Sequence, residues 1–138
     1  MKFLVVILIT VALFISNTII AQENLSITAT VVNVTSDTGK VSFALFDKEN
    51  FRVKPLQAVS SEIKEGKSIA TFTNIKSGAY AIICFHDKNE NNKMDFAKNG
   101  MPLENYGASN NVMNFGPPNY EEAKFVVAEK SVRLEIRF

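Results

Sequence analysis

The chain has 138 residues, with 15 Lys and Arg against 14 Asp and Glu, and a formal net charge of +1. This balance gives no electrostatic footprint for nucleic acid or for an anionic membrane surface. The length fits one domain, which is large enough to build a hydrophobic core without disulfides. The single cysteine excludes an internal disulfide.

The first 21 residues, MKFLVVILITVALFISNTIIA, have the composition of a secretory signal peptide. Lys2 supplies the positive charge, residues 3–15 are mostly apolar, and a small residue precedes Gln22. The alternative is an uncleaved anchor, but a span needs about 20 predominantly apolar residues and this run is shorter. We therefore predict a signal peptide over residues 1–21, a single domain over residues 22–138, a periplasmic or secreted location and no membrane span after cleavage. Cleavage would remove Lys2 and leave 14 basic and 14 acidic residues.

Alternating apolar and polar residues predict half-buried strands along the chain. The alternation appears in residues 25–31, 40–46, 68–72 and 132–138. Residues 79–85, AYAIICF, are apolar on both faces and predict a central strand covered on both sides. Cys84 lies in this run, where a buried small hydrophobe is favoured over a reactive thiol.

These short strands, separated by turn signals, predict an all-β fold. About seven of them favour an antiparallel β-sandwich. Residues 53–67 are ambiguous between a short helix and an irregular edge strand. Residues 87–120 form one long segment rich in Asn, Gly and Pro, whereas structureless loops beyond about 12–15 residues are uncommon. The Met and aromatic residues of this segment predict an ordered loop, with one helical turn at 117–123.

The sequence resembles two known families, each in different stretches. FTNIKSGAYAIICF, residues 72–85, resembles the strand–turn–strand phrase of transthyretin-like, carboxypeptidase-regulatory-type modules. There Gly78 would take a positive φ and Tyr80 would point into the core. HDKNENNKMD, GMPLENYGASNN and FGPPNYEEAKF are similar to the bacterial secreted family catalogued as domain of unknown function 2141. This resemblance implies an exported transthyretin-like or Ig-like sandwich with no established activity. Asn92 replaces a glycine of that pattern, and Asn tolerates the left-handed conformation well.

The tract HDKNENNKMD also has the spacing of a calcium loop. Carboxylate, amide and carbonyl oxygens would converge from loop positions 1, 3, 5, 7 and 9. The predicted calcium ligands are Asp87, Asn89, Asn91, Lys93 (through its carbonyl) and Asp95. Lys98 stands where a bidentate Glu is usual, so weak affinity is expected unless Glu104 folds back to complete the shell. The alternative is an Asn-rich turn held by side-chain-to-backbone hydrogen bonds.

A catalytic role has little support in the residue pattern. A small hydrolase-like enzyme could use His86 and Glu104, but the chain has one histidine and no serine framed as GxSxG. Strand alternation also puts His86 and Asp87 on opposite faces. We therefore predict no enzyme, but a non-catalytic binding or accessory domain of unknown ligand, with calcium a candidate stabiliser of residues 87–95.

The 100–120 loop is the candidate binding surface. Tyr106, Phe115 and Tyr120 alternate there with Asn and Gly, a composition that suits carbohydrate or protein contact. The alternative is that these aromatic rings fold back onto the sandwich.

Overall fold

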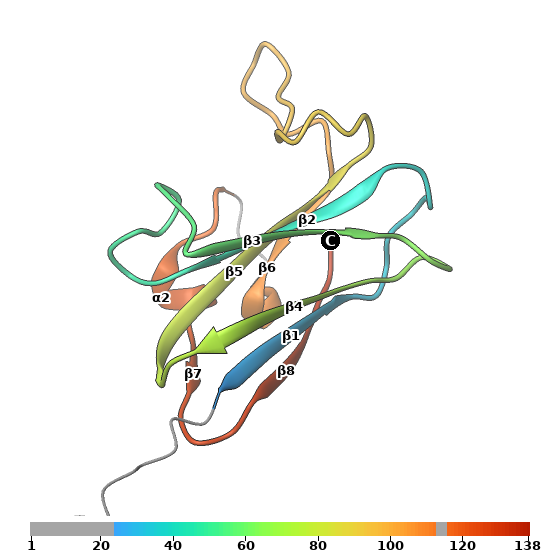
Figure 1. The fold of residues 1–138 in the computed structure, drawn as a ribbon. Coiled ribbons are helices and arrows are strands. Elements are labelled where there is room, and N and C mark those ends of the chain that lie inside the picture. The colour runs from blue at the N-terminus through green and yellow to red at the C-terminus, as the bar shows by residue number, and fades with distance from the viewer. Residues whose placement is uncertain (1–23, 113–115) are drawn as a thin grey trace, which may run out of the picture.

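The computed structural model describes residues 24–112 and 116–138 (Figure 1). The predicted signal peptide and Phe115 lie outside the described residues. The described chain contains eight strands, one 3-10 turn and one short helix. This confirms the all-β class, and no helix in the described part is long and apolar enough to cross a membrane.

The smaller sheet has three strands in the order β4–β1–β8. They are β1 (Leu25–Val31), β4 (Ser68–Ile75) and β8 (Val132–Ile136). β1 is antiparallel to β4 but parallel to β8. The sequence predicted an antiparallel sandwich, and the pair of β1 with β8 is the exception among the described strand pairs. A parallel pair needs a long crossover, and here the whole second sheet lies between β1 and β8 in the chain.

The larger sheet has five strands, four of them in the order β3–β2–β5–β6, with β7 also paired to β5. They are β2 (Lys40–Phe46), β3 (Gln57–Glu62), β5 (Gly78–Asp87), β6 (Tyr106–Ala108) and β7 (Phe125–Val127). β5 is central, as predicted, with β2 on one side and both short strands on the other. The ambiguous 53–67 segment supplies β3, which is an edge strand.

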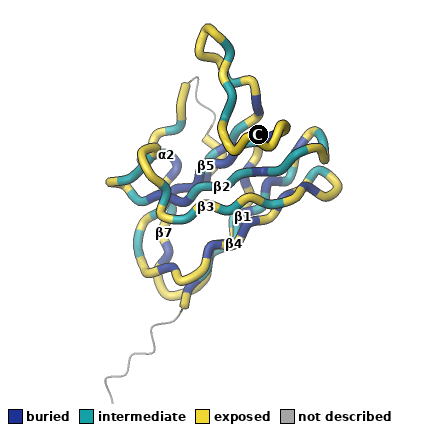
Figure 2. The backbone as a smooth tube through the Cα atoms, turned by 45° about the horizontal axis from the view of Figure 1, so that its top comes forward, coloured by how far each residue is buried: buried dark blue, intermediate teal, exposed yellow. Residues whose placement is uncertain are grey.

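The core lies between the two sheets, where the alternating strands meet (Figure 2). Ile82 and Ile136 are fully buried, and Tyr80 and Leu134 pack partly buried against the same cluster. Arg133 and Arg137 stay exposed, so the predicted register of the last strand is confirmed.

Two further details concern the central strand β5. Cys84 is buried, as predicted, and its burial raises the pKa of the thiol. The expected positive φ at Gly78 was wrong: the residue with positive φ before β5 is Asn74, at 55°. Asn, like Gly, adopts this conformation at modest cost, and Asn74 lies inside β4, where the register between β4 and β1 shifts.

Residues 87–120 are not one loop. The chain leaves β5 into an arm, residues 88–105, and then returns as β6, the 3-10 turn η1 (Ser109–Asn111) and the helix α2 (Tyr120–Ala123). α2 is the single helical turn predicted for 117–123. Figures 1 and 2 show the arm rising beyond the ends of the sheets, with most of its length exposed.

Candidate functional site

The arm begins at a buried carboxylate. Asp87 ends β5 and is fully buried. Its two carboxylate oxygens accept hydrogen bonds from the backbone N–H groups of Asn91, at 3.1 Å, and Asn92, at 2.9 Å. Asn92 has a φ of 62°, so this residue adopts the left-handed conformation that the glycine of the family pattern would favour. The Asp87 carboxylate therefore closes a tight turn.

A second buried carboxylate, that of Glu104, holds the other side of the same turn. It accepts hydrogen bonds from the backbone N–H groups of Lys88 and Asp95, each at 3.1 Å. The arm does fold back, as Glu104 would need in order to join a cation shell. The carboxylate is nevertheless occupied by these two backbone N–H groups, which need an acceptor where they are shielded from water.

The predicted cation ligands come together around Asp95. Its carboxylate accepts hydrogen bonds from the side-chain amides of Asn89, at 2.8 Å, and Asn91, at 3.0 and 2.9 Å. The N–H of Lys93 donates to the Asn91 side-chain oxygen at 2.9 Å. Asp87, Asn89, Asn91, Lys93 and Asp95 thus share one turn, and their arrangement is that of the hydrogen-bonded Asn-rich turn.

A calcium ion at this turn would need the side-chain amide groups of Asn89 and Asn91 rotated, so that their oxygens and not their nitrogens face Asp95. Rotation of a carboxamide by half a turn exchanges its oxygen and nitrogen at little cost in shape. The side chains of Asn89 and Asn91 would then present oxygens beside Asp95. In residues 24–112 and 116–138, no group of three or more His, Cys, Asp or Glu side chains is arranged to hold a metal. The calcium site stays a prediction.

His86 lies on the core side of β5, fully buried. Its Nε2 is 2.7 Å from the carbonyl oxygen of Thr38, which can only accept, so Nε2 carries the proton. Its Nδ1 has no hydrogen-bond partner among the described atoms. The ring therefore ties β5 to the loop before β2, where Gly39 approaches so closely that a Cβ would lie 2.3 Å from the Asp87 carbonyl oxygen.

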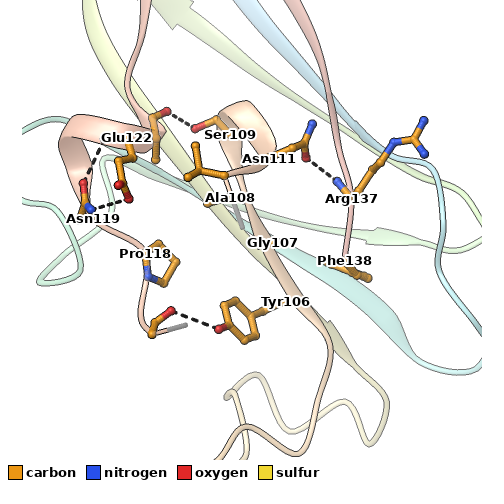
Figure 3. A pocket seen from close by; sticks show the side chains of 13 residues that line it. Tyr106, Gly107, Ala108, Ser109, Asn111, Pro118, Asn119, Glu122, Arg137 and Phe138 are labelled. Atoms are coloured by element: carbon orange, nitrogen blue, oxygen red, sulfur yellow. Dashed lines mark hydrogen bonds between the residues drawn. The ribbon is translucent and has the colours of Figure 1, made fainter. Parts of the chain in front are cut away.

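A concavity of the described surface lies beside Tyr106, at the foot of the arm (Figure 3). It has a volume of about 390 Å³ and is lined by β6, η1, the segment before α2 and the last residues of the chain. Figure 3 shows Tyr106 projecting toward the segment that carries Pro118. The Tyr106 hydroxyl lies 3.4 Å from the carbonyl oxygen of Gly116, to which it can donate a long hydrogen bond.

Hydrogen bonds fix the polar walls of this pocket. The Ser109 hydroxyl donates to the Ala123 carbonyl at 2.5 Å and accepts from the Ile82 N–H at 3.0 Å. The Asn119 side chain accepts from the Glu122 N–H at 3.0 Å and donates to the Glu122 carboxylate at 2.5 Å. The pocket is therefore preformed, because its side chains are held before any ligand arrives.

The chain end completes the pocket. Asn111 accepts from the Arg137 N–H at 2.8 Å and donates to the Glu135 carbonyl at 3.0 Å, which joins η1 to the end of β8. The Arg137 guanidinium points away from Tyr106 (Figure 3). Sequence reasoning missed this contribution, since nothing in the alternating pattern of 132–138 shows that the strand end returns to β6.

Tyr120 does not join Tyr106. Its ring packs edge-on against Phe51, with centroids 5.6 Å apart, and its hydroxyl donates to the Ala79 carbonyl at 3.0 Å. Of the three aromatic residues predicted for the binding surface, Tyr106 alone lines the pocket, Tyr120 folds back onto the sandwich, and Phe115 lies outside the described residues.

The chain matches one family model, described as "Uncharacterized protein conserved in bacteria (DUF2141)", over residues 29–135. The match covers every described strand except the ends of β1 and β8. No curated protein and no solved structure matches the chain. The likeness of residues 72–85 to transthyretin-like modules is compatible with the two-sheet fold.

Proposed function

Because the chain belongs to the uncharacterised bacterial family DUF2141, we propose a function from its geometry: a non-catalytic domain that binds carbohydrate in the pocket beside Tyr106. The observation that carries the proposal is the preformed hollow of about 390 Å³, which the aromatic residues Tyr106 and Phe138 help to line. This volume is at the small end of the range for ligand sites, roughly 300–1,000 Å³, and suits a small ligand.

The chemistry of the lining supports a sugar ligand. The apolar face of Tyr106 and the ring of Pro118 offer surfaces for a sugar ring. Among the described residues, Asn111 and Asn119 each use one amide proton and one lone pair in hydrogen bonds. A carboxamide has two protons and two lone pairs, so each side chain keeps capacity for sugar hydroxyls.

The same lining supports a non-catalytic role. It contains two charged side chains, those of Glu122 and Arg137, and no His, Cys or Lys. The Ser109 hydroxyl donates to a backbone carbonyl, and no His, Asp or Glu side chain of the described residues is hydrogen-bonded to it. His86 and Glu104, the pair on which a hydrolase would depend, are buried with backbone partners and do not line this pocket.

The test is an amide NMR titration of the protein without residues 1–21, with neutral mono- and disaccharides of glucose, galactose, mannose and N-acetylglucosamine. We expect at least one sugar to shift the amides of Gly107 and Ser109, and Tyr106→Ala to remove the shifts. Phe96→Ala is the matched control, because it removes an exposed ring on the arm. Shifts with tripeptides alone, or equal losses in both variants, would contradict a carbohydrate site.

A second candidate function is calcium binding by the arm. Its support is the gathering of Asn89, Asn91 and Asp95 in one turn beside the Asp87 carboxylate. Calcium at a hundredfold above its dissociation constant would stabilise the fold by about 2.7 kcal/mol. We expect millimolar calcium to raise the melting temperature above that in chelator.

Variants of the arm separate a calcium site from a structural turn. Asp95→Asn should remove the calcium-dependent rise, and Lys98→Glu should enlarge it by restoring the usual carboxylate. Glu90→Gln, an exposed change on the same turn, should leave it intact. Asp87→Asn should also remove the rise, but Asp87 holds two backbone N–H groups, so its baseline stability should fall as well. Identical melting curves in calcium and chelator would exclude the site.

We also propose that the protein acts outside the cytoplasm, from the composition of residues 1–21. The processed chain should then begin at Gln22. Intact-mass measurement on protein from the native cell envelope tests this, and recovery of the full-length chain in the membrane fraction would contradict it.

A further inference from the structure

The end of the arm is a tight hairpin with an apolar surface. Phe96 and Pro102 pair as an antiparallel bridge, and the Ala97 N–H donates to the Met101 carbonyl at 2.8 Å. The large apolar side chains of this hairpin are exposed: Phe96 to 57%, Met101 to 62% and Leu103 to 66%. We call residues 96–103 the tip. It places three large apolar side chains within eight residues at the far end of a protrusion (Figure 1), where nothing in the sandwich covers them.

Charge is separated along the arm. The carboxylates of Asp87, Asp95 and Glu104 lie behind the tip and are bonded to backbone or amide N–H groups. The tip itself has the sequence FAKNGMPL, without an acidic residue and with one cation, Lys98. Lys98 is exposed and makes no ion pair within the described residues. The other charges of the arm lie outside the tip, where Lys88 and Lys93 stand against Glu90, Asp95 and Glu104. The only charged side chain of the tip, residues 96–103, is therefore a cation, and it lies among three exposed apolar side chains.

We propose that the tip inserts into the interface of an anionic lipid bilayer. Phe96, Met101 and Leu103 would enter the boundary between headgroups and acyl chains, where apolar side chains of peripheral proteins are buried. Lys98 would extend its ammonium group to lipid phosphates while its methylenes stay in the apolar layer. A convex tip needs no preformed pocket in a soft bilayer, whereas a protein partner would need a matching concavity. This surface is distinct from the Tyr106 pocket, so either proposal can fail alone.

The first test is co-sedimentation with vesicles, using the protein without residues 1–21, which keeps every described strand. It should sediment with vesicles of phosphatidylglycerol and phosphatidylethanolamine, and less with phosphatidylcholine. Replacement of Phe96, Met101 and Leu103 by Ser should lower the binding at least tenfold. Lys98→Gln should lower it severalfold, and on anionic vesicles only.

A matched control removes equally exposed apolar side chains elsewhere. Val53 and Val126 are 82% and 68% exposed on other parts of the surface. Val53→Ser with Val126→Ser should leave the sedimented fraction unchanged. Circular dichroism should show the wild-type unfolding midpoint in all three variants, since every replaced side chain is exposed.

A second measurement reports insertion directly, because the chain contains no tryptophan. Phe96→Trp should show a blue-shifted emission with anionic vesicles and quenching by brominated lipid. Val126→Trp should show neither. The proposal is overturned if the wild-type protein sediments with neither vesicle, if the tip and control variants lose binding equally, or if both tryptophans respond alike.

Discussion

The sandwich and the arm are ordered by different interactions. In the sandwich, apolar side chains from β1, β2, β4, β5 and β8 pack between two sheets. In the arm, the large apolar residues point outward, and the buried carboxylates of Asp87 and Glu104 collect four backbone N–H groups instead. The burial of apolar area is spread over many contacts, whereas two side chains hold the root of the arm, where the chain leaves β5 and returns to β6.

This difference indicates which positions tolerate substitution without a large loss of stability. A core built from many side chains relaxes around a loss, at a cost that depends on the cavity left behind. A loop organised by one carboxylate loses several hydrogen bonds when that carboxylate goes, because buried N–H groups are left without acceptors. The arm can vary at its exposed tip only while Asp87 and Glu104 keep its root in place.

Ile82→Ala should cause the largest loss, since Ile82 is fully buried in the central strand. We expect a cost of about 2–5 kcal/mol in the free energy of unfolding, measured by denaturant titration. Arg133→Ala, on an exposed position of β8, should stay within about 0.5 kcal/mol. A larger cost at Arg133 than at Ile82 would mean that the two faces of the strands are assigned the wrong way round.

Glu104→Gln should lower the free energy of unfolding by about 1–3 kcal/mol. The Gln amide has an NH2 group in place of one carboxylate oxygen, so a donor would face one of the two backbone N–H groups. The loss should be seen as faster hydrogen exchange at Lys88 and Asp95, the two N–H groups that Glu104 accepts from. Glu90→Gln is the matched control on an exposed carboxylate and should change neither. Unchanged exchange in Glu104→Gln would show that the arm is held by something else.

Gly39→Ala should cost more than Gly100→Ala, although both glycines have a φ near 80° (79° and 80°). The left-handed conformation costs an alanine about 1–2 kcal/mol at either site. At Gly39 the added Cβ would also lie 2.3 Å from the Asp87 carbonyl oxygen, whereas at Gly100 it meets nothing within 4 Å. Equal unfolding free energies for the two variants would mean that this close contact relaxes freely.

The smallest expected effect is that of a thiol reagent on the folded protein, in which Cys84 should not react. It is fully buried, and burial raises the pKa of its thiol, so the reactive thiolate is scarce at neutral pH. Labelling should become rapid in denaturant. Rapid labelling of the native protein at neutral pH would contradict the buried position of β5.

The sequence predicted the sandwich well because alternation is local information. The faces of residues 132–138, the central place of 79–85 and the burial of Cys84 all follow from side-chain period alone. The parallel pairing of β1 with β8 could not be predicted from the sequence. It depends on which edge of the smaller sheet the chain joins after it has formed the larger sheet. The Tyr106 pocket was missed in part for the same reason, since Asn111 and Arg137 meet only after that return.

In the arm, the sequence showed which residues gather but not what they bind. The spacing of Asp87, Asn89, Asn91 and Asp95 predicted one turn, and the structure brings them together. A calcium loop and an Asn-rich turn use the same alternation of oxygen-bearing side chains, so spacing cannot choose between them. The role of Glu104 as an acceptor for two backbone N–H groups depends on a contact across 16 residues.

Hydrogen exchange of the arm tests the central claim most directly, which is that buried carboxylates order a segment without an apolar core. In the protein without residues 1–21, and with chelator present, the amides of Lys88, Asn91, Asn92 and Asp95 should exchange slowly, because each donates to Asp87 or Glu104. The amide of Asn89, for which no such bond is seen, should exchange faster. If all five amides exchange at the rate of an unstructured peptide while β5 stays protected, the account of the arm is contradicted.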